Sequence, residues 1–428
     1  MLTVNDRREL IQDYYRTAEM QVTDLPRREL AVMGLDGRIL RHQQKDTHEE
    51  LTTWLIQQAP KAFYASLAVY LDPENKSNKF DERKTTICQE CGQSWKLQEG
   101  KRVDNEACPN CKTRNASGIT STKDFKGQDL AFDIDYGDIP GADKRSPSEN
   151  LGAASLSTFN LFTILTEDLG ISRDDILITF SGGKGFHVRV MNTGLRPLDE
   201  KARRSLIDYV SGYNFKLMDF VKEVANFQAK PSWHLKGFES GWGKRFNESV
   251  AYFVGLSTRD NDDFEKACTM YWPWFEDKDK YGTKKMQASM KLMAAFKKSC
   301  AENKAILTGG DLRKLEDTHA KRLLSLSLAR SRLRYACFVD KRVTADKARI
   351  LRVPGSLHGG KGMVCCVVPT VEHLKNLDWV LELQAEVLGD HEVHVSIKHV
   401  SNTYYGVFEP GEHRVPYHQA IAILCAQV

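Results

Sequence analysis

One short stretch constrains this chain more than any other, the segment Asp129-Leu-Ala-Phe-Asp133-Ile-Asp135-Tyr-Gly137. Its apolar residues alternate with small or acidic ones, which is the period-2 pattern of a half-buried strand. Asp133 and Asp135 therefore project from the same face of that strand. Two carboxylates this close repel each other unless a cation lies between them, and a pair of divalent metal ions is the usual solution. The alternative is an ordinary strand whose acids face water.

The size and composition of the chain are those of an ordinary globular protein. Its 428 residues can form one large domain with insertions, or two or three units. No apolar run is long enough to span a membrane, and the segment from Met1 to Arg8 lacks the apolar core of a signal peptide, so we expect an intracellular protein without a membrane partner. Residues 312–352 hold twelve Lys and Arg against four Asp and Glu. This excess fits either a solvated helix surface or contact with phosphates.

Four of the ten cysteines form two closely spaced pairs, each with the pattern Cys-x-x-Cys. They are Cys88, Cys91, Cys108 and Cys111. This arrangement matches a zinc ribbon, in which four thiolates close a tetrahedral shell around Zn²⁺. Gly92 and Asn110 suit the tight turns of the two pairs. Because no position is left for water, the predicted zinc site is structural rather than catalytic. We expect residues 84–116 to form a zinc-ribbon insertion between two strands of the core.

A glycine-rich turn lies between two further predicted strands, Asp175–Phe180 and Phe186–Val190. Its sequence, Ser181-Gly-Gly-Lys-Gly185, allows backbone N–H groups to approach an anion. The side chains that could converge on a phosphate here are Ser181, Lys184, His187 and Arg189. The turn is neither a Walker A loop nor a dinucleotide-binding loop, because it joins two strands instead of opening a helix. An ordinary glycine-rich hairpin is the alternative.

Other segments have weaker signals. Helical periodicity predicts helices at 6–20, 48–58, 156–169 and 416–427, and residues 197–335 look mostly helical. An Asp36-Gly37 dipeptide predicts a hairpin, and a short strand is expected over Ser66–Tyr70. The charged residues at the ends of the hairpin strands are most simply explained as surface charges. They are Arg28, Glu29, Arg41 and His42.

A last informative stretch runs from Phe338 to His358. A short apolar run predicts a strand that ends at Asp340, where a third carboxylate could complete a metal site. Arg352, Ser356 and His358 cluster about a Pro-Gly turn. Side chains of these three types are suited to binding a phosphate. Taken alone, such an acid and such a turn are more often surface features.

Together, these motifs resemble the archaeal–eukaryotic primase superfamily, and within it the catalytic small subunit of the archaeal replicative DNA primase. The matching motifs, in order, are Arg28-Glu29-Leu30, Asp133-x-Asp135, Ser181-Gly-x-Lys-Gly-x-His187, Asp340 and Leu351-Arg-Val-Pro-Gly-Ser-Leu-His358. They span most of the chain, and the cysteine pairs lie between the first two motifs. The combination in this order is specific, whereas no single motif is.

The resemblance implies an α/β (α+β) fold in which a primase catalytic domain occupies residues 1–428. A mixed central sheet flanked by helices would carry an inserted zinc ribbon and a helical subdomain at 197–335. By resemblance, Asp133, Asp135 and Asp340 would hold two catalytic Mg²⁺ or Mn²⁺ ions. The residues implied to bind the incoming nucleotide are Arg28, Ser181, Gly182, Lys184, His187, Arg352 and His358.

The activity implied by the resemblance is that of a DNA primase in DNA replication. Two-metal nucleotidyl transfer would build short RNA primers, or DNA primers, from NTPs or dNTPs on single-stranded DNA. The implied partner is a large subunit with an iron–sulfur domain. The chain departs from the family in two ways: Lys184 stands where many relatives have Arg, which weakens the expectation of a bidentate phosphate contact, and its zinc ligands are four regularly spaced cysteines.

Three alternative functions are consistent with part of the pattern. A nucleotide-sugar glycosyltransferase also uses an Asp-x-Asp motif, but that class predicts neither the zinc ribbon nor the Ser181–His187 hairpin. A zinc-ribbon protein that binds nucleic acid would leave Asp133 and Asp135 without a role. A primase–polymerase of repair, end joining or translesion synthesis is the nearest alternative, although end-joining polymerase domains generally lack such a zinc insertion.

Overall fold

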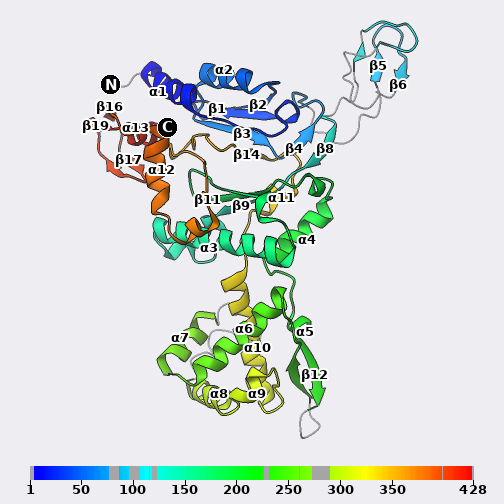
Figure 1. The fold of residues 1–428 in the computed structure, drawn as a ribbon, viewed down its shortest axis with the longest axis vertical. Helices are drawn as coiled ribbons and strands as arrows, with labels where there is room; N and C mark the ends of the chain where they lie inside the picture. Colours follow the sequence, from blue (N-terminus) through cyan, green and yellow to red (C-terminus); the bar gives the residue numbers. More distant parts are fainter. Residues whose placement is uncertain are drawn as a thin grey trace. The chain divides into compact units, whose positions relative to one another are not determined.

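The computed structural model describes residues 4–76, 86–95, 107–114, 116–117, 123–225, 231–259, 261–271, 290–397 and 399–426. The chain divides into two compact units, drawn in Figure 1. Unit 1 consists of Met1–Thr158, Arg173–Ser205 and Val339–Val428, and unit 2 of Phe159–Ser172 and Leu206–Phe338. A helical subdomain was expected at 197–335. The main segment of unit 2 starts at Leu206 instead, and the unit also includes the separate segment Phe159–Ser172. Among the described helices, none is long and apolar enough to cross a membrane.

The first sheet of unit 1 has the strand order β14-β3-β1-β2, with every neighbouring pair antiparallel. Helices α1 and α2 cover this sheet (Figure 1), and their apolar side chains, such as Tyr15 and Trp54, share one core cluster with Leu30 and Phe63 of the strands. The predicted hairpin at Asp36-Gly37 is confirmed, and Gly37 has the positive φ of 80° that its turn requires. The elements are α1 (Val4–Thr17), β1 (Leu30–Met33), β2 (Ile39–Gln43), α2 (His48–Gln58), β3 (Ala62–Ser66) and β14 (Ile350–Arg352).

The second sheet of unit 1 has the strand order β15-β10-β11-β9, again antiparallel throughout. Its strands are β9 (Leu130–Asp135), β10 (Ile176–Phe180), β11 (Gly185–Val190) and β15 (Cys366–Val367). The register places His187 opposite Asp133 and Gly185 opposite Asp135. The strands predicted around the glycine-rich turn are thus confirmed.

The α+β class expected from the sequence is confirmed, but the sheet arrangement differs from the expectation. All described strand pairs are antiparallel, and the two largest sheets have four strands each, where one mixed central sheet was expected. The turns at Asp36-Gly37 and at Ser181–Lys184 explain part of this difference, because strands joined by so few residues can pair only in antiparallel fashion.

Several smaller elements of unit 1 complete the fold, and two of them, α3 and α4, continue into the segments of unit 2. A predicted strand at Ser66–Tyr70 is instead split between the end of β3 and β4, because the guanidinium of Arg28 binds the carbonyl oxygens of Ser66 and Leu67 at this point. The remaining elements are β4 (Ala68–Tyr70), β8 (Phe125–Gln128), α3 (Pro147–Thr163), α4 (Glu200–Val210), α11 (Lys341–Ala345), α12 (Asp378–Leu388), β16 (Glu392–Ile397), β17 (Ser401–Thr403), β18 (Gly406–Phe408), β19 (Gly411–Pro416) and α13 (Tyr417–Ala426).

The segment with the cysteine pairs contains a small three-stranded sheet with the order β6-β5-β7, in which Cys88 ends β5 and the other three cysteines lie outside the strands. Its strands are β5 (Thr86–Cys88), β6 (Ser94–Trp95) and β7 (Ala116–Ser117). Part of the zinc ribbon predicted at 84–116 lies outside the described residues, namely 84–85, 96–106 and 115.

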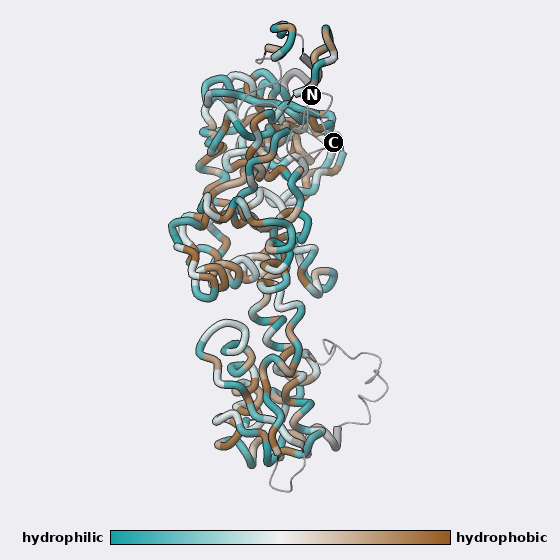
Figure 2. Tube along the Cα trace, turned by 90° about the vertical axis from the view of Figure 1, so that its right-hand side faces the viewer, coloured by the Kyte–Doolittle hydropathy of each residue, from teal (hydrophilic) through white to brown (hydrophobic). Residues whose placement is uncertain are grey.

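Unit 2 is mostly helical. Asp168, in the segment Phe159–Ser172 of this unit, accepts hydrogen bonds from Arg245 (2.5 Å) and Tyr209 (3.0 Å). The hairpin formed by β12 and β13 departs from the helical expectation. Figure 2 shows hydrophilic and hydrophobic residues interspersed along the trace. The elements are α5 (Leu217–Phe220), β12 (Val221–Ala225), β13 (Pro231–Leu235), α6 (Gly241–Ser257), α7 (Asn261–Tyr271), α8 (Met290–Glu302), α9 (Lys304–Thr308) and α10 (Asp317–Tyr335).

Candidate active site

Three acidic side chains predicted to bind metal come together in unit 1. Asp133 and Asp135 project from β9, and Asp340 is joined to this strand because its backbone N–H donates to the carbonyl oxygen of Asp133 at 2.9 Å. Asp340 does not end a strand, as the sequence suggested, but caps the N-terminus of α11. Burial, together with the charges of Asp135 and Asp340, raises the pKa of Asp133 to about 7. The nearby basic side chains therefore do not fully balance the negative charge of the three carboxylates.

The three carboxylates are close but are not gathered around a single point. Asp340 accepts a hydrogen bond from the N–H of Arg342 and forms an ion pair with Arg349, each at 2.9 Å. Within the described ranges, only the four cysteines of the zinc module form a group of three or more metal-binding side chains whose ligand atoms all lie within 4.8 Å of one another. Carboxylate oxygens with unbalanced charge are nevertheless the ligands that Mg²⁺ and Mn²⁺ prefer.

The glycine-rich turn between β10 and β11 lies next to these acids. It is closed by a hydrogen bond of 2.9 Å from the N–H of Ser181 to the carbonyl oxygen of Gly185. A Cβ atom at Gly185 would lie 1.8 Å from the carbonyl oxygen of Ile134, and one at Gly183 would lie 2.3 Å from Nε2 of His358. Only glycine fits at these two positions, so the turn can pack directly against β9 and against the imidazole of His358.

A groove with a volume of about 390 Å³ lies between the two sheets of unit 1. It brings together most of the residues that the sequence singled out, although not Asp340 or Gly182, and it adds four polar residues that sequence reasoning missed as site residues. The predicted residues that line it are Asp133, Asp135, Ser181, Lys184, His187, Arg352 and His358. The additional polar ones are Arg41, Tyr64, Asp346 and Arg349. Acids and cations therefore share one groove, which suits a polyanion that is bound together with metal ions.

The two histidines of the groove are neutral. Burial, with the charge of Arg352 as a further cause, lowers the pKa of both His187 and His358 to about 3. Nδ1 of His358 accepts a hydrogen bond of 3.1 Å from the N–H of Gly360, so the proton of this imidazole is on Nε2, which faces Gly183. His358 thus presents an N–H donor to the glycine-rich turn.

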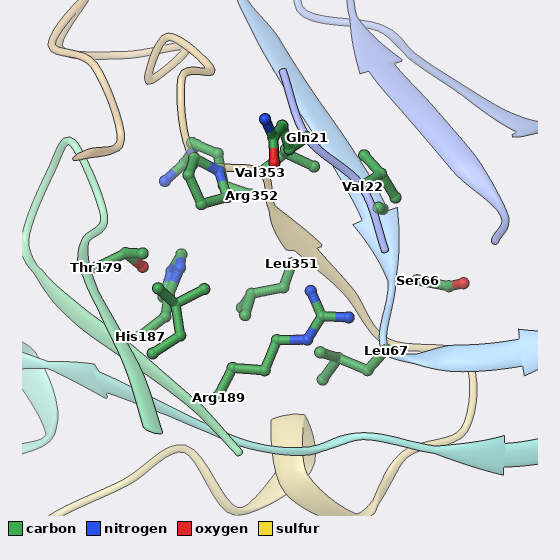
Figure 3. A pocket seen from close by; sticks show the side chains of 13 residues that line it. Gln21, Val22, Ser66, Leu67, Thr179, His187, Arg189, Leu351, Arg352 and Val353 are labelled. Atoms are coloured by element: carbon green, nitrogen blue, oxygen red, sulfur yellow. The ribbon is translucent and has the colours of Figure 1, made fainter. Parts of the chain in front are cut away.

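A second, smaller cavity of about 30 Å³ lies behind His187 and Arg352 (Figure 3). Nδ1 of His187 and Nε of Arg352 are buried, and neither atom has a hydrogen-bond partner among the described residues. The volume is sufficient for one or two water molecules. The two side chains therefore lie between this cavity and the larger groove, and both cavities include them in their linings.

The prediction that Arg28 binds the nucleotide is not supported by its position. Its side chain is completely buried and does not line the groove. The guanidinium forms an ion pair of 2.7 Å with Asp129 and donates to the carbonyl oxygen of Leu67 at 2.6 Å. Burial lowers the pKa of Arg28 to about 10, and the charge of Asp129 opposes this shift. Arg28 therefore holds the fold of unit 1 together.

Arg189 also lies apart from the other predicted phosphate-binding side chains. It forms an ion pair with Asp129, which is bound by Arg196 as well at 2.7 Å. Arg189 and His187 share a face of β11, as expected from their spacing, but Arg189 lines only the smaller cavity in Figure 3. Its guanidinium serves the same buried ion-pair network as Arg28.

The four cysteines fit a structural zinc ion. Both pairs have the same backbone pattern, in which the first cysteine exchanges hydrogen bonds with the residues after the second. Gly92 and Lys112 take the positive φ values of these turns, whereas Asn110 was the residue expected in the second one. The Sγ atoms of Cys88 and Cys111 are 3.4 Å apart. A tetrahedral shell with Zn–S bonds of about 2.3 Å places its sulfur atoms about 3.8 Å apart, close to this distance.

Comparisons with known proteins relate the chain to one family. The family model described as DNA primase small subunit matches residues 132–369, which is more than half of the chain. The chain is also similar to the DNA primase small subunit PriS of Methanosarcina barkeri, with 28% identity over 97% of this chain and 94% of that protein. The corresponding proteins of Methanococcoides burtonii and Picrophilus torridus are 27% and 25% identical, over 86% and 95% of this chain and 82% and 93% of those proteins. The matched region contains the three acids, the glycine-rich turn, Arg352 and His358.

Proposed function

Because this chain belongs to the DNA primase small-subunit family, whose members act as nucleotidyltransferases in DNA replication, we propose that the groove of unit 1 is its active site. One observation carries the proposal: carboxylates whose negative charge is not fully balanced line the same groove as several basic side chains. A nucleoside triphosphate needs both, because its phosphates bind cations and its transfer requires divalent metal ions. The carboxylates Asp133, Asp135 and Asp340 would hold Mg²⁺ or Mn²⁺.

The metal ions, when bound, would activate the 3′-hydroxyl of the primer strand and stabilise the triphosphate and the leaving pyrophosphate. The ion pair between Asp340 and Arg349 supports a role of Asp340 in metal binding. A divalent metal ion, which has a higher charge than the guanidinium of Arg349, would compete for the same carboxylate. Release of Arg349 would leave its guanidinium in the groove, where it can bind a phosphate.

The remaining residues would bind the triphosphate. Lys184 and Arg352 supply positive charge, and the neutral His358 supplies the N–H donor on Nε2. Such donors stabilise negative charge as it develops on the phosphates. Arg352 also donates to the carbonyl oxygen of Ser181 at 2.5 Å, which couples its position to that of the glycine-rich turn.

The finer features of the activity are part of the same proposal. We infer a DNA-directed RNA polymerase activity that makes short primers from NTPs, and from dNTPs as well, on single-stranded DNA. The relatives are named as the small subunit of DNA primase, which implies a larger partner subunit, and the family resemblance suggests one with an iron–sulfur domain. The four cysteines would bind structural zinc.

The test is synthesis on single-stranded DNA with labelled nucleotides and Mg²⁺ or Mn²⁺, with and without the co-expressed large subunit. We expect template-dependent products from the wild type and none from the double variant Asp133→Ala and Asp135→Ala. A matched control is Asp143→Asn, which removes an exposed acid that does not line the groove and should leave synthesis unchanged. Equal synthesis by the double variant and the wild type would refute the proposed site.

A further inference from the structure

A turn near the C-terminus reaches the glycine-rich turn of the groove. The hydroxyl of Tyr404, which lies between β17 and β18, donates a hydrogen bond of 2.6 Å to the carbonyl oxygen of Gly183. The two residues are 221 positions apart in the chain. The matched family region ends at residue 369, so this contact comes from a part of the chain that the family model does not cover.

The hydrogen bond completes a pair of side-chain anchors on the glycine-rich turn, in which the carbonyl oxygen of Lys184 also accepts the backbone N–H of Tyr136 at 3.1 Å. Arg352 holds the carbonyl oxygen of Ser181, and Tyr404 holds that of Gly183. All described peptide bonds are trans, so the N–H group of each peptide points away from its carbonyl group. The N–H groups of Gly182 and Lys184 are therefore turned away from the two anchors.

Lys184 is exposed and lines the groove, whereas Gly182 and Gly183 are buried. Within the part of the chain that the structure describes, the N–H groups of Gly182, Gly183 and Lys184 donate no hydrogen bond. Successive free N–H groups in a glycine-rich turn form a concavity that binds anions. Because glycine has many accessible backbone conformations, a concavity of this kind keeps its shape only if something fixes the peptide planes.

The surroundings of Tyr404 keep its hydroxyl protonated and in place. Burial raises the pKa of Tyr404 to about 12, with Tyr136 and Asp135 as further causes, so the phenol remains a hydrogen-bond donor at neutral pH. The ammonium group of Lys361 lies 5.8 Å from the centre of its ring. This contact is a cation–π interaction that favours the observed ring position.

We propose that Tyr404 is a positioning residue of the nucleotide site, which fixes the Gly183–Lys184 peptide so that the amide of Lys184 receives the triphosphate of the incoming nucleotide. The inference rests on the proposed function of the groove. It makes the β17–β18 turn a functional part of the site, although this turn contributes no residue to the groove lining.

The adjacent residue provides a matched control. The hydroxyl of Tyr405 is buried and has no hydrogen-bond partner among the described residues, so Tyr405→Phe removes the same atom without removing an anchor. A hydrogen bond of this kind contributes about 0.5–1.5 kcal/mol, which corresponds to a factor of roughly 2 to 12 in binding. We therefore expect Tyr404→Phe to raise KM for the nucleotide by about fivefold, with kcat changed by less than about twofold.

The experiment compares the wild type, Tyr404→Phe and Tyr405→Phe in primer extension, with the large subunit present, and records KM, kcat and the melting temperature of each protein. A rise in KM that is confined to Tyr404→Phe, without loss of melting temperature relative to Tyr405→Phe, supports the proposal. Equal KM values for the two variants, or a loss of kcat alone, would overturn it. A wild type that shows no template-dependent synthesis would instead refute the proposed function of the groove, which separates the two failures.

Discussion

Two aspartates of one strand region behave in opposite ways. Asp129, just before β9, is 3% exposed and is surrounded by three arginines, which hold the pKa of its carboxyl below the usual range despite the opposing effect of burial. Asp133, within β9, has two further acids beside it, and burial together with their charges raises its pKa to about 7. The same residue type thus carries balanced charge at one position and unbalanced charge at the other.

This difference in charge balance distinguishes acids that stabilise the fold from acids that can bind a metal ion. A buried carboxylate that has a full set of cationic partners gains nothing from a metal ion, and its loss leaves those partners without a counter-charge. A carboxylate that is repelled by its neighbours and lines an open groove is stabilised by a bound cation. The partners of an acid therefore indicate its role better than its motif does.

The largest effect that would test this comparison is expected for Asp133→Asn. Removing one proposed metal ligand should lower nucleotide incorporation by about a thousandfold, in the range seen when a group that stabilises transition-state charge is lost. The melting temperature should be unchanged or higher, because repulsion of Asp135 and Asp340 is relieved. Primer-extension rates and thermal denaturation measure both effects, and a strongly destabilised but active variant would contradict the comparison.

The opposite result is expected for Asp129→Asn. Three arginines lose their buried counter-charge, and only the more exposed Asp24 remains to pair with Arg28 and Arg196. Because the fully buried Arg28 cannot reach water, the free energy of unfolding should fall by about 3–5 kcal/mol. Urea denaturation gives this value. The control is Asp24→Asn, which removes a more exposed partner of Arg196 and should cost much less. Similar losses for both variants would show that burial of the ion pair is not the deciding factor.

The cysteine module extends the comparison to a second metal site. Its four sulfur atoms are already gathered, unlike the carboxylates of the groove, so its metal should stay bound during purification. We expect about one zinc ion per chain in the wild type and almost none after Cys108→Ser, as measured by elemental analysis. Cys337→Ser changes a buried thiol outside the module and should leave the zinc content as it is.

The smallest effect concerns acid stability. The pKa of Asp129 and that of Glu29 are both held below their usual values by basic partners, although burial opposes this. The folded state therefore binds fewer protons than the unfolded state near pH 4, and stability should decrease as the pH falls below about 4.5. Urea denaturation at several pH values should show this decrease, and it should be weaker in Glu29→Gln. If the free energy of unfolding of Glu29→Gln depends on pH as steeply as that of the wild type, Glu29 does not contribute to the decrease.

Local signals in the sequence predicted much of the fold, and non-local contacts account for what was missed. Helix α2 and the hairpin of β10 and β11 were predicted from periodicity and turn residues, which act between neighbours in the chain. The structural role of Arg28 was not, because its partner Asp129 lies 101 positions away. Tyr404 gave no signal for the same reason. The β12–β13 hairpin was missed because its surroundings have helical periodicity.

The candidate site was predictable to a similar extent. The acids and the phosphate-binding residues were found because each lies in a short pattern with a known chemical use. Arg349 was not found, because its contact with Asp340 depends on how the chain turns after α11. A motif identifies a residue type that is suited to a reaction, but only the fold shows whether a buried counter-charge has already engaged it.

The order of the strands has a consequence for synthesis of the chain. Both four-stranded sheets of unit 1 receive an edge strand, β14 or β15, from the segment that follows unit 2. These strands leave the ribosome roughly 200 residues after β9, which is about 10–40 s at the usual rates of translation. During this interval β3 and β10 each have an unpaired edge in the growing chain. Unpaired edges are where chains join one another by strand pairing, so the newly made protein should be most prone to aggregate before its last quarter has been translated.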